Sequence, residues 1–188
     1  MTPGTNLAHA FGQRVDEHPE MPAIIARDMT ISYGKLRAIS DVFTWRMHAL
    51  GIGPGATVAI DTSDVIVALS AMFASARLGG RFVGLNQDIL QSEVVNPTHF
   101  LRSPDRPPRD GIDAIEVDRT WSPKFAPELA GKSVHDLGFA DSEQPWWILH
   151  TSGTTGGPKF MELSQGAVHD RSIAARVDFT PNKTRFCS

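Results

Sequence analysis

Nine consecutive residues, 151–159, carry the residue types that hold phosphate groups. The segment reads Thr-Ser-Gly-Thr-Thr-Gly-Gly-Pro-Lys, with three glycines, four hydroxyl side chains and one lysine. Glycines let backbone N–H groups approach an anion closely, because no side chain stands in the way. Hydroxyl groups add neutral donors, and a lysine adds a charge-assisted hydrogen bond of about 1.5–3 kcal/mol. The segment therefore predicts a phosphate-binding loop at 151–159.

Lys159 is the candidate catalytic residue, because its charge would neutralise phosphate. The candidate phosphate ligands are Thr151, Ser152, Gly153, Thr154, Thr155, Gly156, Gly157 and Lys159. A plain glycine-rich hairpin with a solvated lysine is the simpler alternative. The loop differs from that of the P-loop NTPases, because Pro158 replaces the glycine before the lysine and Phe160 replaces the Mg²⁺-binding Ser or Thr. No metal ligand is assigned, since no two histidines fall within one helical turn.

The elements around the loop alternate between helix and strand. Apolar spacing and capping residues predict helices at 7–17, 33–50, 64–78 and 165–176, and strands at 23–26, 30–32, 57–61, 81–85, 146–150 and 160–163. Such alternation is typical of an α/β fold with a mainly parallel sheet flanked by helices. Residues 91–144 form the weakest pattern, with six of the 13 prolines between Pro97 and Pro127. We expect mostly surface loop there, with a candidate strand at 112–117.

Composition narrows the class of protein. A chain of 188 residues is predicted to form a single domain. Its 18 basic and 21 acidic residues give a net charge of −3, which argues against a nucleic-acid partner or an anionic lipid surface. The one cysteine cannot close an intramolecular disulfide, and the longest apolar run, 65–76, is shorter than the roughly 20 residues of a membrane span. Because the first residues also lack a secretory pattern, we expect a cytoplasmic protein without a membrane span.

The loop resembles the signature of the acyl-adenylate-forming (AMP-binding) enzymes, Thr-Ser-Gly-Thr-Thr-Gly-x-Pro-Lys, at every fixed position. This superfamily includes acyl-CoA synthetases, peptide-synthetase adenylation domains and luciferases. Three upstream segments, 31–36, 50–60 and 77–86, also resemble its motifs, so that most of the chain outside 91–144 is covered. The sequence departs from the family pattern at His150 before the loop, at Phe160 after its lysine and at Gln165 at the next helix start.

The resemblance implies an ATP-dependent ligase with ATP, Mg²⁺ and a carboxylic acid as partners. The carboxylate would attack the α-phosphate of ATP to give acyl-AMP and pyrophosphate, and a thiol such as CoA would then accept the acyl group. The loop would hold the β- and γ-phosphates. Family members are much longer, so we predict that residues 1–188 form a single incomplete N-terminal AMP-binding domain that alone neither adenylates nor binds ATP tightly. Apolar surface left uncovered would favour self-association.

Two alternatives stay open from the sequence. The chain could be a non-catalytic remnant or interaction module that retains the fold. It could also be a stand-alone nucleotide-binding regulator. The regulator predicts measurable ATP affinity for these 188 residues, lost in Lys159→Ala. The ligase predicts that the gene continues into the adenine-binding segment and a C-terminal lysine.

Overall fold

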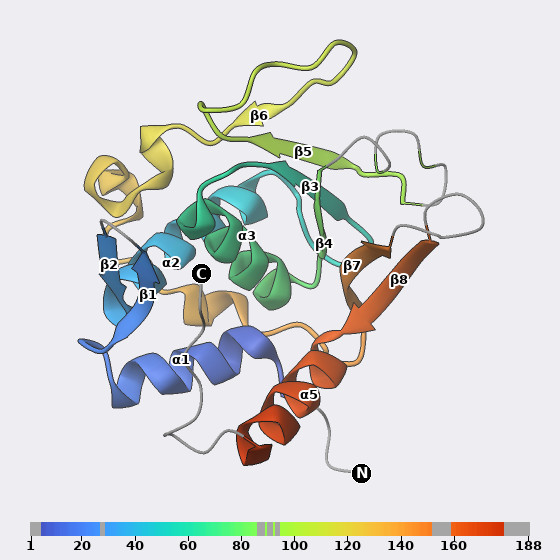
Figure 1. The fold of residues 1–188 in the computed structure, drawn as a ribbon. Helices are drawn as coiled ribbons and strands as arrows, with labels where there is room; N and C mark the ends of the chain where they lie inside the picture. Colours follow the sequence, from blue (N-terminus) through green and yellow to red (C-terminus); the bar gives the residue numbers. More distant parts are fainter. Residues whose placement is uncertain are drawn as a thin grey trace.

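A six-stranded sheet forms the centre of the computed structural model, which describes residues 5–26, 29–85, 89, 92, 95–151 and 159–178. Its strand order is β6-β5-β3-β4-β7-β8 (Figure 1). The strands are β3 (Thr57–Asp61), β4 (Arg81–Gly84), β5 (His99–Arg102), β6 (Ile115–Glu116), β7 (Pro145–Thr151) and β8 (Lys159–Ser164). Every neighbouring pair is parallel except β7 and β8, which are antiparallel. The predicted α/β fold with a mainly parallel sheet is confirmed.

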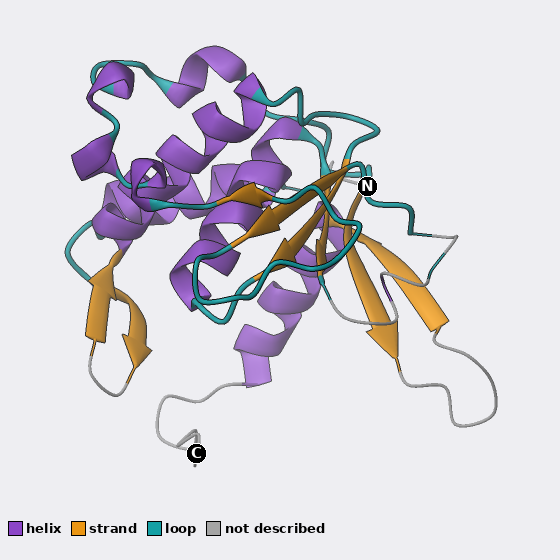
Figure 2. Ribbon diagram, turned by 90° about the horizontal axis from the view of Figure 1, so that it is seen from above, coloured by secondary structure: helices purple, strands orange, loops and turns teal. Residues whose placement is uncertain are grey.

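Helices cover the sheet. Figure 2 shows them gathered on one side of the six strands, with the small β1–β2 hairpin standing apart. The helices are α1 (Leu7–Glu17), α2 (Tyr33–Ala49), α3 (Val65–Leu78) and α5 (Gln165–Asp178), and the hairpin is β1 (Pro22–Ala26) and β2 (Met29–Ser32). Within the described residues, no helix is both long and apolar enough to cross a membrane.

Side-chain caps explain where the helices begin. The Asn6 side chain accepts hydrogen bonds from two backbone N–H groups of α1, Ser32 caps α2, and Asp64 caps α3. Each cap satisfies an N–H group that has no partner inside the helix. These boundaries agree with the sequence expectation within one or two residues.

Two apolar clusters of the core lie on opposite faces of the sheet. On the helical face, Val58 and Ile60 of β3 pack with Phe43 and Met47 of α2 in the larger cluster. On the other face, Ala59 packs in a second cluster, which also includes Ile89 and Val95 from the connection after β4. Successive side chains of a strand point to opposite faces, and all five residues of β3 are buried because both of its faces are covered.

Gly79 ends α3 in the left-handed conformation, with φ of 82°. A Cβ at this position would lie 2.9 Å from Cβ of Ala140 and 3.3 Å from Cγ of Pro54. We expect Gly79→Ala to lower the free energy of unfolding by about 1–2 kcal/mol, through left-handed strain and overpacking. Urea denaturation measures this, with Gly53→Ala as the control, because a Cβ there meets its nearest neighbour at 3.7 Å. Equal losses in both variants would contradict the explanation.

The structure adds short elements to residues 91–144, the segment expected to be mostly surface loop. This segment supplies β5, which pairs with β3 inside the sheet, and β6 beyond it. The remainder contains four short 3-10 helices: η1 (Arg119–Trp121), η2 (Pro123–Phe125), η3 (Pro127–Leu129) and η4 (Val134–Leu137). Trp121 and Val134 of these helices are buried. The candidate strand at 112–117 is reduced to Ile115–Glu116. The sequence did not predict β5, because a four-residue strand between proline-rich stretches is too short to show a clear alternation of apolar and polar residues.

Candidate functional site

The parallel strands end together at one edge of the sheet, where ligands of open α/β folds usually bind. At this carboxyl edge lies a cavity of about 370 Å³ over the ends of β3, β4 and β7. Its walls include Ile60, Gly84, Trp147, Leu149 and His150. The cavity is mostly apolar, and β7 contributes one side of it directly before the predicted phosphate loop.

The ends of the predicted phosphate loop are fixed by strand pairing. Thr151, the last residue of β7, is the register partner of Lys159, the first residue of β8. Directly opposed residues of an antiparallel pair have Cα atoms about 4.5–5.5 Å apart, so the loop begins and returns at one point of the carboxyl edge. The predicted ligands Ser152, Gly153, Thr154, Thr155, Gly156 and Gly157 lie outside the described residues.

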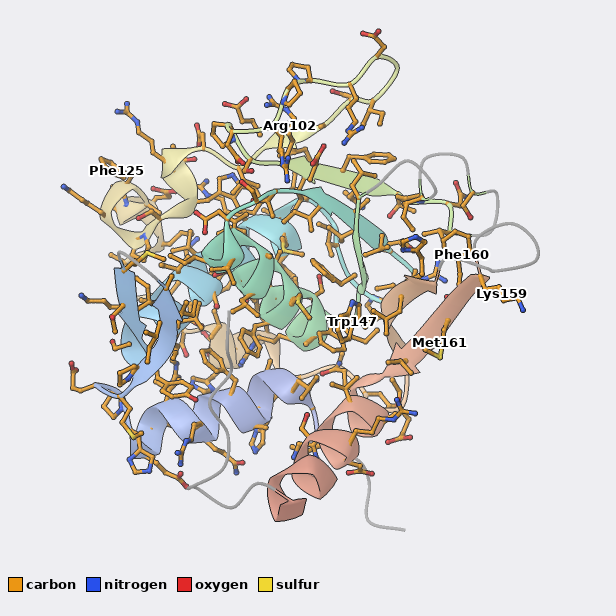
Figure 3. All side chains as sticks on the ribbon, viewed as in Figure 1. Arg102, Phe125, Trp147, Lys159, Phe160 and Met161 are labelled. Atoms are coloured by element: carbon orange, nitrogen blue, oxygen red, sulfur yellow. The ribbon has the colours of Figure 1, made fainter. Side chains whose placement is uncertain are left out.

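Lys159 and Phe160 point to opposite faces of β8, because side chains alternate along a strand. Lys159 is exposed at the start of the strand, and Figure 3 shows its side chain extending away from the sheet. Phe160 is partly buried against the cluster that contains Ala59 and Ile148. The bulky ring that replaces a small family residue is therefore a packing residue, and it does not occupy the face of the strand that carries the lysine.

Of the residues just before the loop, some pack in the core and others line the cavity. Trp146 is 4% exposed and packs with Ala8 and Ala76, whereas Trp147 packs beside α3 and lines the cavity (Figure 3). His150, which differs from the family pattern, also lines the cavity, with its ring centroid 6.5 Å from that of Phe160. The structure thus brings His150, Trp147 and the two ends of the loop to the same edge.

Gln165, the third departure, is a buried anchor for the elements after the loop. Its side chain is 1% exposed, although it starts α5 directly after β8. Nε2 donates to the carbonyl of Ala76 at 2.8 Å, and Oε1 accepts from the backbone N–H of Leu7 at 2.9 Å. Asn6 donates to the same Ala76 carbonyl at 3.0 Å. Gln165 therefore ties the loop's exit strand to the start of α1 and the end of α3.

A charged cluster beside the cavity was missed by the sequence analysis. Asp61 ends β3 with a side chain that is 7% exposed, and its carboxylate accepts a 2.8 Å hydrogen bond from Nε of Arg109. Nε of Arg106 lies 3.5 Å from the other oxygen. Nearby, hydrogen bonds from the Ser103 and Ser63 hydroxyls hold the pKa of the Asp105 carboxyl below its ordinary value. An aspartate that directly follows three apolar strand residues, Val58 to Ile60, is the signal that could have located this cluster.

Among the residues that the structure describes, no group of three or more His, Cys, Asp or Glu side chains is placed to hold a metal ion. Asp61 is engaged by two arginines, so it has no free charge to offer a cation. The described residues of the site therefore form an apolar cavity wall and place one exposed lysine, Lys159, at the same edge of the sheet.

Comparisons with known proteins agree with this geometry. The family model of the AMP-binding enzymes matches residues 11–188. The chain is 27% identical over 191 residues to FR901469 synthetase of Dothideomycetidae sp. (strain 11243), and 29% identical over 189 residues to nonribosomal peptide synthetase ecdA of Aspergillus rugulosus. Each alignment covers 93% of this chain but only 1% and 2% of the synthetases.

Solved structures show the same fold. VinN in complex with 3-methylaspartate superimposes with a TM-score of 0.76 at 19% identity, over 94% of this chain and 53% of that one. The o-succinylbenzoate CoA synthetase of Bacillus subtilis, in complex with its acyl-adenylate intermediate, gives 0.70 at 21% identity, over 92% and 46%. The chain thus spans about half the length of these enzymes. Because the family model matches nearly the whole chain, the protein belongs to the AMP-binding enzyme family.

Proposed function

We propose that this chain is the N-terminal part of an ATP-dependent ligase that activates a carboxylic acid as its acyl-adenylate. The observation that carries the proposal is the pairing of Thr151 with Lys159, which closes the glycine- and hydroxyl-rich loop at the carboxyl edge beside the cavity. The loop's N–H and hydroxyl groups would bind the β- and γ-phosphates of ATP, and Lys159 would neutralise their charge. Phosphoryl and nucleotidyl transfer depend mainly on such positioning and charge neutralisation.

Mg²⁺ belongs to the proposal as the ion that accompanies ATP. The described residues include no cluster of His, Cys, Asp or Glu side chains that would bind it. The proposed partners are ATP, a carboxylic acid and a thiol acceptor. CoA is one candidate acceptor, and the carrier thiol of a peptide synthetase is the other, since the relatives above include synthetases of that class. The proposed location is the cytoplasm.

Carboxylate-dependent exchange of pyrophosphate into ATP tests the first step. The assay should use the whole translation product that contains these 188 residues, with a panel of amino acids and of carboxylic acids without an amino group. Exchange with an amino acid would favour a carrier thiol, and exchange only with other acids would favour CoA. No exchange with any acid, by a folded protein that binds ATP, would contradict the ligase and favour a regulator.

Self-association of the 188-residue chain is a further proposal. Met161 on the edge strand β8 and Val65 at the start of α3 are 44% and 43% exposed, so each offers apolar surface that a second copy could cover. Sedimentation velocity over a hundredfold range of concentration should show a rising average mass. Met161→Lys should reduce it, with Met21→Lys as a control at an equally exposed methionine on the other side of the fold. A monomer throughout would contradict the proposal.

A further inference from the structure

A second cavity lies away from the carboxyl edge, between α1, α2, α3 and the segment of η4. Its volume is about 130 Å³, and it shares no lining residue with the cavity beside the phosphate loop. An apolar cavity of about 150 Å³ is large enough for benzene. This cavity is slightly smaller, so it has room for one small planar ring at most, and both aromatic and charged residues line it.

One wall is aromatic. The rings of Phe11 on α1 and Phe73 on α3 are stacked, with centroids 4.1 Å apart and planes inclined by 10°. Phe139 lies at another side of the cavity, with its ring in edge contact with His9. A flat apolar ring is the shape that such surfaces accommodate best.

The cavity also contains a buried arginine, one helical turn after Phe73 on α3, whose hydrogen bonding is incomplete. Arg77 is 7% exposed, its Nε donates to the carbonyl of Val134 at 2.9 Å, and its guanidinium lies 4.0 Å over the ring of Phe139. Its Nη2 is buried and has no hydrogen-bond partner among the described residues. A buried donor without an acceptor is costly, and for a guanidinium the acceptor that fits best is a carboxylate.

The acidic groups that face the cavity are already engaged by a different arginine. Arg37 donates to Asp16 at 2.6 Å, approaches Asp41 at 3.8 Å, and contacts Nε2 of His135 at 3.0 Å. Burial raises the pKa of the Asp41 carboxyl above its ordinary value, against the opposing effects of Arg37, Arg77 and His135. The charge that lacks a direct partner is therefore the cation Arg77, so the complementary ligand is an anion.

From these contacts we infer that the cavity between α1, α2, α3 and η4 binds a small aromatic monocarboxylate, with its carboxylate on Arg77 and its ring against Phe11 and Phe73. The site is separate from the proposed ATP site, and its existence does not depend on the proposed ligase activity. Benzoate is the probe of matching size and charge, and benzamide is its neutral counterpart of the same shape.

Two-dimensional ¹H–¹⁵N NMR of the 188-residue chain tests the inference. Benzoate should bind with a dissociation constant in the millimolar range, and the shifted resonances should include Gly12, Thr44 and Phe139, which line the cavity. Benzamide should bind at least tenfold more weakly. Shifts centred on Leu149 and His150, or equal binding of benzoate and benzamide, would overturn the inference, as would no shift at 50 mM benzoate.

Gly12 provides the variant that fills the cavity. It lines the cavity from within α1, and a Cβ at this position meets no atom within 4 Å. Gly12→Leu should weaken benzoate binding at least tenfold, whereas the matched Gly12→Ala should stay within about threefold of the original chain. Alanine and leucine both have a higher helix propensity than glycine, so neither substitution should destabilise α1. Arg77→Gln should also weaken binding at least tenfold. Unchanged binding in Gly12→Leu would overturn the inference even if Arg77→Gln fails to fold.

Discussion

Replacing Gln165 by methionine is expected to lower the free energy of unfolding by about 2–3 kcal/mol. Methionine keeps the length and volume of the side chain but removes both of its hydrogen bonds, to Leu7 and to Ala76. Each hydrogen bond contributes about 1 kcal/mol to the free energy of unfolding. The backbone N–H of Leu7 would also lose its acceptor, and an unsatisfied N–H group lowers the stability further. The Ala76 carbonyl keeps the bond from Asn6, so the larger loss is at the start of α1.

Urea denaturation followed by circular dichroism measures this change. Gln144→Met is the matched control, because Gln144 is exposed just before β7 and its replacement should alter stability by less than about 0.5 kcal/mol. Gln165→Met should also loosen the junction between β8 and α5, which amide hydrogen exchange would report as faster exchange there. A loss no larger than that of the control would show that Gln165 is not the anchor.

Removing the charge of Lys159 should have the largest effect on activity. In the whole translation product, we expect Lys159→Ala to reduce kcat/KM for carboxylate-dependent pyrophosphate exchange by about 10- to 150-fold. That range corresponds to the loss of one charge-assisted hydrogen bond of about 1.5–3 kcal/mol. The residue is exposed at the start of β8, so the substitution should leave the stability of the fold unchanged.

Two controls separate a local effect from a general loss of positive charge. Lys124→Ala removes a lysine from η2, in a different part of the fold, and should leave the exchange rate within about twofold. Lys159→Arg keeps the charge with a different geometry and should retain more activity than alanine. Equal activity of Lys159→Ala and the original protein would contradict the proposed role of the loop.

The sequence predicted the elements that local signals define. Asn6, Ser32 and Asp64 cap the helices that follow them, and Gly79 ends α3, because caps and left-handed glycines act within a few residues. It did not predict β5, because that strand is defined by pairing with β3 and has little periodicity of its own. Strand pairing between distant segments is a tertiary property that a local pattern does not contain.

The candidate site was predictable only at its ends. The composition of 151–159 indicated the chemistry, and the strands on either side of it are confirmed as the pair that joins Thr151 to Lys159. The cavity wall required the strand order, which places Trp147 of β7 beside β4. The role of Gln165 was also hidden, because a polar residue at a helix start looks like a surface residue until its neighbours from α1 and α3 are known.

The central claim is that residues 151–159 hold the phosphates of ATP at the carboxyl edge of the sheet. The most direct measurement is a titration of ATP·Mg²⁺ into the ¹⁵N-labelled 188-residue chain, followed by ¹H–¹⁵N NMR. We expect only weak binding, with a dissociation constant of about 1 mM or higher, shifts confined to residues 148–161 and the facing ends of β3 and β4, and their loss in Lys159→Ala. Sub-millimolar affinity that is lost in Lys159→Ala would instead favour the stand-alone regulator. Shifts centred elsewhere, or shifts that persist unchanged in Lys159→Ala, would contradict the central claim.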